Sequence, residues 1–352
     1  MRFLLLLIVV FLFFNSSKKH MISKYHFSDV IIEPILEDSI NIRAIEVDTD
    51  FMMYAGSEGK YGYYKIKKGF QFEKRNIENI SYEDKVPNYR AIASNATNFF
   101  ILSVESPALL YMINKKSGKA TLVYKEDHEK VFYDSMIFWN DKEGIAMGDP
   151  TDTCLSIIST RDGGESWNKI SCDDLPETKE GEAAFAASNS NIAVVGDKTW
   201  MISGGMKSRV FYSPNKGKTW KVFETPLTQG TSTTGGYSID FYDEKNGVIY
   251  GGDYTKPEMN DKNKAITTDG GITWHLVASG SGAGYKSCVR YIPNSKNQGM
   301  IAVGSSGISV SHNNGTSWKN ISDTGFYTIR FLSDTIAIAA GKNRIAKITF
   351  IK

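Results

Sequence analysis

Cysteine, proline and histidine are scarce in this chain, whose 352 residues include 3 Cys, 9 Pro and 5 His. So few cysteines exclude a disulfide-dense scaffold. The cysteines and histidines are also scattered, and they form no cluster with the spacing of zinc ligands. We therefore expect no metal site and no bound cofactor.

An excess of charge of one sign is lacking as well. Lys and Arg total 41 and Asp and Glu total 39, which leaves a net charge of +2 and no strong field for nucleic acid. A nucleotide-binding loop is also lacking. Gly280, Gly282 and Gly284 lie between predicted strands with the wrong spacing for Gly-x-Gly-x-x-Gly, and no helix pattern follows them. The sequence therefore excludes nucleic acid as a partner and gives no support for nicotinamide chemistry.

Long apolar runs are lacking except at the start of the chain, where residues 3–14 are all apolar. That run is shorter than the roughly 20 residues that span a bilayer. Arg2 precedes it and the small polar residues Asn15, Ser16 and Ser17 follow it, which is the order of a signal peptide. We predict a signal peptide at residues 1–17 and one mature domain at 18–352 with no membrane span, secreted or periplasmic and monomeric. An uncleaved N-terminal anchor is the alternative.

Glycine and aromatic residues, in contrast, are plentiful, with 31 Gly, 18 Tyr and 19 Phe. This composition suits short strands joined by tight turns. One pattern, Ser/Thr-x-Asp/Asn-x-Gly-x-Ser/Thr-Trp, occurs four times, at Thr160–Trp167, Ser213–Trp220, Thr267–Trp274 and Ser311–Trp318. Two degenerate copies begin at Gly69 and Gly118, and the aligned glycines are 44 to 54 residues apart. Such a period predicts a β-propeller with one four-stranded blade per repeat.

Each repeated segment is interpreted as a structural β-hairpin turn. The Asp or Asn side chain accepts hydrogen bonds from backbone N–H groups two or three residues further on. The glycine takes the positive-φ position of the turn, and the tryptophan packs over it at the start of the next strand. The residues assigned to this structural role are Asp162, Trp167, Asn215, Trp220, Asp269, Trp274, Asn313 and Trp318.

Short apolar segments recur between these turns and predict the innermost strand of each blade. They are Ile42–Ile45, Tyr89–Ile92, Tyr133–Phe138, Ala183–Ala186, Tyr237–Phe241, Ser287–Arg290 and Tyr327–Phe331. Their number predicts an all-β propeller of seven blades, with six as the alternative. The last blade lacks one strand, because the chain stops soon after Phe350. The N-terminal segment His26–Ile32 has strand composition, and we expect it to complete the last blade and remove an exposed sheet edge.

The cysteines divide into a pair and a single residue. Cys154 and Cys172 lie eight residues before and after the turn Asp162–Gly164 and are therefore nearly opposite in that hairpin. Facing residues of an antiparallel pair are close to the spacing that a disulfide accepts. We predict a Cys154–Cys172 disulfide, with two free thiols in an off-register hairpin as the alternative. Cys288 falls in a predicted inner strand and is interpreted as a small buried hydrophobe.

With these turns, the chain resembles the Asp-box (BNR-repeat) propellers of the sialidase-like superfamily. Its segments Gly148–Pro150 and Gly251–Tyr254, together with Arg43 and Arg90, resemble more closely the Ycf48/Hcf136-like photosystem II assembly factors and their bacterial relatives. The resemblance implies that ligands bind on the face opposite the Asp boxes, around the central channel. The ligand-binding candidates on that face are Arg43, Arg90, Asp149, Glu182, Tyr237, Asp253, Tyr254, Tyr285 and Lys286.

These candidates combine Arg for anions with Tyr for stacking, although pairs of Arg and Asp that merely close the channel are an alternative interpretation. We hypothesise an exported, non-catalytic propeller that holds a protein or a small polar ligand at its channel mouth, during envelope protein assembly. The other hypothesis is a carbohydrate-active hydrolase using Asp149, Glu182 and Asp253, since glycosidases need two carboxylates at a set separation. Sialidase activity is disfavoured, because the Arg-Ile-Pro signature is absent from the first blade.

Overall fold

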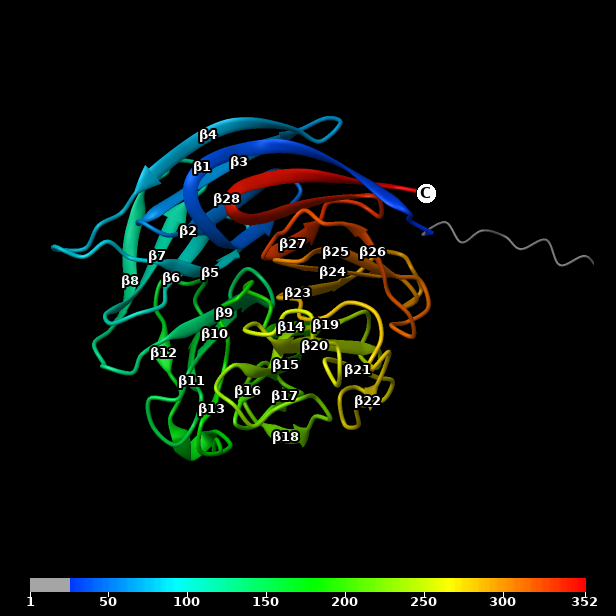
Figure 1. The fold of residues 1–352 in the computed structure, drawn as a ribbon. Coiled ribbons are helices and arrows are strands. Elements are labelled where there is room, and N and C mark those ends of the chain that lie inside the picture. The colour runs from blue at the N-terminus through cyan, green and yellow to red at the C-terminus, as the bar shows by residue number, and fades with distance from the viewer. Residues whose placement is uncertain (1–25) are drawn as a thin grey trace, which may run out of the picture.

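The computed structural model describes residues 26–352, which form six antiparallel sheets around a central axis (Figure 1). The predicted signal peptide lies outside the described residues. Four of the sheets hold four strands each. The first of these sheets holds β5 (Tyr89–Ser94), β6 (Asn98–Ser103), β7 (Ala108–Asn114) and β8 (Ala120–Glu126), and the second holds β9 (Tyr133–Phe138), β10 (Gly144–Gly148), β11 (Ser156–Thr160) and β12 (Asn168–Lys169). The third holds β14 (Ile192–Val195), β15 (Lys198–Ile202), β17 (Arg209–Ser213) and β18 (Lys221–Glu224). The fourth holds β23 (Cys288–Tyr291), β24 (Met300–Gly304), β25 (Gly307–Ser311) and β26 (Lys319–Ser322).

The two remaining sheets are larger and hold six strands each. One extends β19 (Thr234–Phe241), β20 (Gly247–Asp253), β21 (Lys264–Thr267) and β22 (His275–Leu276) by the short strands β13 (Glu182–Ala183) and β16 (Gly204–Gly205). The other runs in the order β27 (Thr328–Phe331), β28 (Ile336–Ile351), β1 (Asp29–Val47), β2 (Phe51–Gly56), β3 (Lys60–Lys67) and β4 (Gln71–Asn79). The all-β propeller predicted from the repeats is therefore confirmed.

The prediction of seven blades was wrong, and the alternative of six is what the described residues form. The cause is the length of β1, which pairs with β28 from Asp29 to Asn41 and continues without a break into its pairing with β2 from Ile42 to Val47. The segments predicted as the first and last blades therefore share one hydrogen-bonded sheet. Sequence periodicity counts repeated segments and does not reveal that two of them are joined by a single strand.

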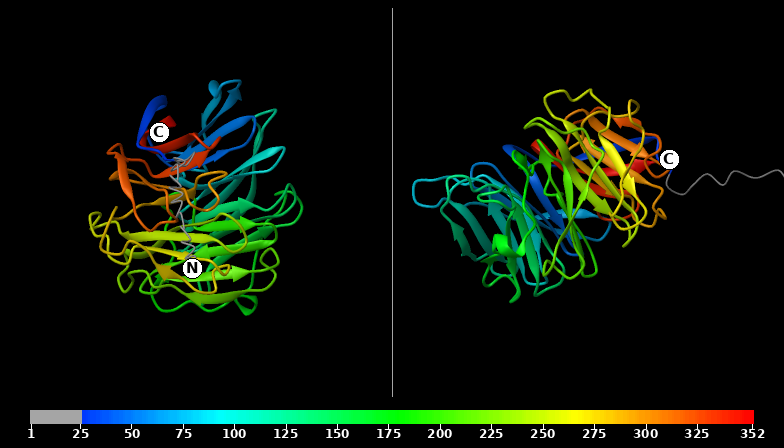
Figure 2. Two further views of the ribbon diagram at one scale, coloured as in Figure 1. Left: turned by 90° about the vertical axis from the view of Figure 1, so that its right-hand side faces the viewer. Right: turned by 90° about the horizontal axis from the view of Figure 1, so that it is seen from below.

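The pairing of the N-terminal segment with the end of the chain is present as expected. Asp29 lies opposite Ile351 and Ile32 opposite Ile348 in the β1–β28 ladder. The two strands lie side by side in all views (Figures 1 and 2). This pairing gives the last strand a hydrogen-bonding partner, which removes a sheet edge on which another chain could pair.

The core lies between neighbouring sheets. One cluster joins Ala91 and Phe100 of one sheet to Met136, Ala146 and Ile158 of the next. The central strands are buried on both faces by this packing, and every residue of β10 and β24 is buried. Such strands are continuous apolar runs in the sequence rather than alternating ones, which is why they were recognisable.

The four Asp-box segments form the predicted hairpin turns. Asp162 accepts hydrogen bonds from the Thr160 hydroxyl at 2.8 Å and from the Ser166 backbone N–H at 3.1 Å, so its acceptor reaches four residues ahead. The same bonds recur at Asp269, with the Thr273 N–H at 3.0 Å. Three of the four tryptophans donate the indole N–H to the turn glycine, as Trp274 does to the Gly271 carbonyl at 3.1 Å. These contacts satisfy the turns internally, as a structural role requires.

The predicted disulfide is confirmed. Cys154 and Cys172 are bonded, with their Cα atoms 5.5 Å apart, and Cys288 is a free and buried thiol. Cys172 begins a short 3₁₀ helix, η1 (Cys172–Asp174), just beyond the end of the hairpin. Within residues 26–352, no helix is long and apolar enough to cross a membrane.

Candidate functional site

The central channel is occupied by a segment of the chain itself, Ala184–Asn191, which we call the channel segment. Ala183–Ala186 was predicted to be the inner strand of its blade, and that prediction was wrong. The inner strand is β14, and the channel segment crosses from β13 to β14 without strand pairing. Its residues are almost all Ala, Ser and Asn, whose short side chains fit a narrow space.

Polar groups of the channel segment bond to the inner strands of several sheets. The Asn189 side chain donates to the Ile92 carbonyl at 2.7 Å and accepts from the Met136 N–H at 3.0 Å. The Ser190 hydroxyl donates to Ser238 at 2.8 Å, and Thr328 donates to the Ser188 carbonyl at 2.9 Å. These bonds reach β5, β9, β19 and β27, so the segment fastens the inner strands to one another. It also forms the floor of the space above it.

That space is a cavity of about 490 Å³, which we call the mouth cavity. Its floor is formed by Ala183–Ala187, and its walls are residues that begin inner strands or follow second strands. The Asp-box turns join third and fourth strands, so antiparallel pairing places the cavity at the opposite end of the sheets. Six of the nine predicted site residues line it, namely Arg43, Arg90, Asp149, Tyr237, Tyr254 and Tyr285.

Two arginines supply the positive charge of the mouth cavity. The guanidinium of Arg43 lies 4.0 Å from the centre of the Tyr327 ring and donates to the Ala187 carbonyl at 3.4 Å. Arg90 lies 6.0 Å from the Phe132 ring, and burial, with the nearby charge of Arg43, lowers its pKa. Neither arginine forms an ion pair with a carboxylate of residues 26–352. Two like charges held in a partly buried site favour the binding of an anion.

A carboxylate also faces this cavity. Asp149 accepts the backbone N–H of Ala184, the first residue of the channel segment, at 2.7 Å, and burial raises the pKa of Asp149 to about 6. Behind it, Asp134 is 0% exposed, and neither of its carboxylate oxygens has a hydrogen-bond partner. Burial and the neighbouring Asp149 hold the pKa of Asp134 well above its usual range. Burial and Asp149 thus favour the neutral form of Asp134, which the charge of Arg90 opposes, and Asp149 is the acid whose charge changes near neutrality.

Aromatic rings also line the mouth cavity. Phe185 of the channel segment stacks on Tyr237 with ring centres 3.9 Å apart and an interplanar angle of 4°. Tyr285 and Tyr254 approach the same Tyr237 ring edge-on, at 4.8 and 6.4 Å. Tyr254 is 53% exposed and offers the accessible surface of this group. The cavity thus combines anion-binding groups with aromatic surface for stacking or apolar contact, and Arg43 lies against one of the rings, that of Tyr327.

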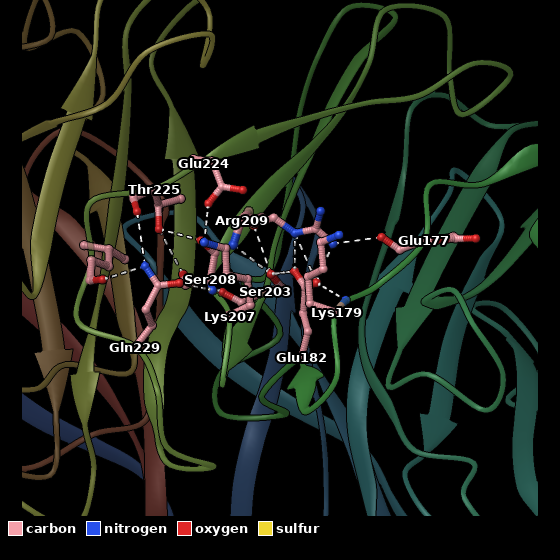
Figure 3. Close-up of polar contacts among 11 residues, drawn as sticks. Glu177, Lys179, Glu182, Ser203, Lys207, Ser208, Arg209, Glu224, Thr225 and Gln229 are labelled. Atoms are coloured by element: carbon pink, nitrogen blue, oxygen red, sulfur yellow. Dashed lines mark hydrogen bonds and ion pairs between the residues drawn. The ribbon is translucent and has the colours of Figure 1, made fainter.

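Glu182 lies beside the mouth cavity but has a structural role (Figure 3). Its carboxylate accepts from the Arg209 Nε at 3.0 Å, from the Ser203 hydroxyl at 2.5 Å and from the Lys179 N–H at 2.9 Å. The side chains of Glu182 and Arg209 are 0% and 7% exposed. The pair joins β13 to β17, and the carboxylate is not free to meet a ligand.

Asp253 and Lys286 are likewise bonded within the protein. Asp253 accepts a hydrogen bond from the Thr255 hydroxyl at 2.6 Å. Burial alone would raise the pKa of Asp253, but the hydrogen bonds from Thr255 outweigh it and lower that pKa. Lys286 is buried and donates to the Gly307 carbonyl at 2.8 Å, and burial lowers its pKa to about 8. The structure therefore separates these two residues and Glu182 from the six that line the mouth cavity.

The sequence analysis missed several wall residues. Phe132, Phe185, Ser232 and Tyr327 all line the mouth cavity. Tyr327 begins a predicted inner strand just as Tyr237 does, so its place in the repeat was a usable signal. Phe185 could not be assigned, because the channel segment was interpreted as a strand. Within residues 26–352, no group of three or more His, Cys, Asp or Glu is placed to hold a metal ion.

Fold, turns and cavity together define an Asp-box β-propeller with a closed channel and one polar mouth. The BNR/Asp-box repeat matches residues 265–276, which contain the whole Thr267–Trp274 turn. The comparison with curated proteins gives no match. The chain is thus a propeller of the BNR type.

Among solved structures, the chain is similar to "YCF48 bound to D1 peptide", with a TM-score of 0.64, 11% identity, and coverage of 94% of this chain and 96% of that one. YCF48 from Cyanidioschyzon merolae gives a TM-score of 0.62 at 12% identity, covering 92% and 98%. The WD40 repeats of RRP9 give 0.63 at 11% identity, also covering 92% and 98%. The similarity to a WD40 protein shows that the shared feature is the propeller fold.

Proposed function

We propose that this protein is a non-catalytic binding propeller that holds an acidic segment of a partner protein in its mouth cavity. The observation that carries the proposal is the pair Arg43 and Arg90, which share one cavity and form no ion pair with a carboxylate among residues 26–352. A protein carboxylate can accept two parallel N–H donors from a guanidinium, which gives geometric specificity as well as energy. Arg43 is held in place by the Tyr327 ring and by its hydrogen bond to the channel segment.

A protein partner is supported by the accessible side of the cavity. Tyr254 is half exposed at its rim, and tyrosine is a frequent anchor in protein interfaces because it offers contact area at low cost in conformational entropy. The similar fold of YCF48 has been solved with a D1 peptide bound. That structure supports peptide binding as a use of this fold, and we extend it to this chain as a proposal.

Within residues 26–352, the structure does not supply the pair of accessible carboxylates that the hydrolase hypothesis requires. A glycosidase needs two carboxylates that both reach the substrate. Of the three candidates, Glu182 is bound to Arg209 and Asp253 to Thr255, which leaves Asp149 as the carboxylate in the mouth cavity. Asp134 lies near Asp149 but is fully buried. No observation favours hydrolysis over binding.

We also propose that the protein acts outside the cytoplasm, during the assembly of envelope proteins. Disulfides persist in oxidising compartments, and the Cys154–Cys172 bond supports export. Mass spectrometry of the N-terminal peptide from the native organism tests the export signal. We expect a mature chain that begins near residue 18, and an intact Met1 peptide in the exported protein would favour the anchor instead.

Photo-crosslinking in the native organism tests the binding site itself. A photo-reactive residue replaces Ser232, which lines the mouth cavity, in the wild-type background and in an Arg43→Ala/Arg90→Ala background. We expect crosslinks to a discrete partner that are lost in the double variant. The control carries the photo-reactive residue at exposed Glu165 in an Asp-box turn and gives none. Equal crosslinking with and without the arginines would contradict the proposal.

A further inference from the structure

We propose that the partner segment does not end in the mouth cavity but continues, as an extended chain, into a second cavity that selects basic side chains. This inference rests on the proposed function and deepens it. The second cavity, which we call the outer groove, has a volume of about 580 Å³. It is lined by the loop after β10 and by the stretch that leads into β13, including Asp152, Thr153, Glu177, Lys179 and Glu180.

The two cavities adjoin each other. Asp149 and Ala183 line both of them, so the wall between the cavities is the contact in which Asp149 accepts the Ala184 N–H. A chain that places a carboxylate at Arg43 and Arg90 can leave the mouth cavity past Asp149. Its next residues then enter the outer groove. The geometry therefore offers a continuous path for a polypeptide rather than two separate small-molecule sites.

The walls of the outer groove are cross-linked. The Cys154–Cys172 disulfide and an isolated antiparallel β-bridge between the backbones of Cys154 and Glu177 hold the two loops together. The Thr178 N–H donates to the Thr153 carbonyl at 2.8 Å, and Arg209 donates to the Glu177 carbonyl at 2.8 Å. Figure 3 shows how the buried Glu182–Arg209 pair fixes this stretch. A groove with fixed walls loses little conformational entropy when a chain binds, which favours affinity.

The charges of the outer groove are opposite to those of the mouth cavity. Asp152, Glu177 and Glu180 are exposed at its rim, against Lys130 and Lys179. None of these five side chains forms an ion pair with another residue of 26–352. With Asp149 at the junction, the groove is net acidic, whereas Arg43 and Arg90 make the inner site basic. The fitting partner therefore carries an acidic residue followed, a few residues away, by basic ones.

Defined peptides test this inference by calorimetry at low ionic strength. The short probe is acetyl-Leu-Glu-Leu-amide, which carries only the acidic group. Two longer probes add a Ser-Lys-Ser-Lys or a Ser-Glu-Ser-Glu tail, and each is made with the tail at either end, since both chain directions are tested. We expect one lysine-tailed probe to bind about fivefold more tightly than the short probe, the size of effect that one or two exposed charge pairs give. The glutamate-tailed probe gains nothing.

The variant Asp152→Asn/Glu177→Gln/Glu180→Gln removes the three acidic charges at the rim of the groove without touching the backbone bonds of the walls. We expect it to bind the lysine-tailed and short probes equally, with the affinity for the short probe unchanged. Glu165→Gln in an Asp-box turn is the matched control and leaves all affinities unchanged. Equal binding of all tails by the wild type would overturn the outer groove and leave the mouth cavity standing. Absence of binding by every probe would overturn both.

Discussion

At the Asp-box end of the propeller, four turns repeat one set of hydrogen bonds, whereas at the mouth end each sheet contributes different side chains. The Asp-box bonds are local, joining residues two to four apart, as between Asp162 and Ser166. The mouth end depends instead on distant partners, such as Arg43 with Ala187 and Asp149 with Ala184. Repetition therefore marks the residues that build the fold, and departure from repetition marks the residues that can bind.

The largest expected effect concerns a mouth-end pair that we regard as structural. Arg209→Met should lower the free energy of unfolding by about 3–5 kcal/mol, because it leaves the buried Glu182 carboxylate without its cationic partner. Urea unfolding measures this loss. The double variant Glu182→Gln/Arg209→Met should recover part of it, since no buried charge then remains unpaired. A single variant as stable as the wild type would show that Glu182 is available to a ligand after all.

The next largest effect concerns the Asp-box end. Gly164 has φ +91°, and a Cβ placed there would lie 2.2 Å from the Phe100 ring. Gly164→Ala should destabilise the protein by about 2–4 kcal/mol through backbone strain and overpacking.

The degenerate repeat supplies the matched control for this substitution. Gly69 has φ +75° but nothing within 4 Å of the added methyl group, so Gly69→Ala should cost about 1 kcal/mol. Equal losses at the two glycines, measured by urea unfolding, would refute a packing role for the turn.

A smaller effect distinguishes the two ends by pH. Because burial raises the pKa of Asp149 to about 6, lowering the pH from about 7.5 to about 5.5 neutralises it. The glutamate of the short probe stays mostly ionised over this range. Buried Asp134 is a charged neighbour of Asp149, Arg90 shares the mouth cavity with it, and Lys130 lines the outer groove with it. We expect probe affinity to rise about fivefold on acidification.

The control for this pH effect is Asp149→Asn. The amide oxygen can still accept the Ala184 N–H, so the floor of the cavity is kept while the titrating charge is removed. This variant should bind the probe with the same affinity at both pH values. A pH dependence that survives in the variant would assign the effect to another group.

At the Asp-box end, the pKa of a carboxyl group is shifted in the opposite direction, downward. Although burial opposes the shift, hydrogen bonds from Ser166 and Thr160 lower the pKa of Asp162 to about 2. A carboxyl group whose pKa is lowered by folding stabilises the folded state at pH values above its unfolded-state pKa of about 4. That stability is lost as the pH falls from about 4 to about 2, and Asp162→Asn should flatten this part of the stability curve. An unchanged curve would show that the turn does not depend on the carboxylate.

The same contrast explains what the sequence could predict. The Asp-box turns, the propeller and the Cys154–Cys172 disulfide depend on local spacing and repetition, and these were accessible. The channel segment was not, because Ala183–Ala186 has the composition of an inner strand and its bonding partners lie on distant strands such as β5 and β27. The pairing of Glu182 with Arg209, 27 residues away, was equally invisible. Matched positions in the first two inner strands singled out Arg43 and Arg90, and both line the mouth cavity, while their binding role stays a prediction.

The central claim is that two arginines that form no ion pair within residues 26–352 make the mouth cavity an anion site for a protein segment. The most direct test is the dissociation constant of acetyl-Leu-Glu-Leu-amide for the wild type and for Arg43→Gln/Arg90→Gln, measured by calorimetry at pH 7. We predict a loss of about tenfold or more, since charge-assisted hydrogen bonds contribute about 1.5–3 kcal/mol each. Equal dissociation constants for a double variant that unfolds at the wild-type urea concentration would contradict the claim.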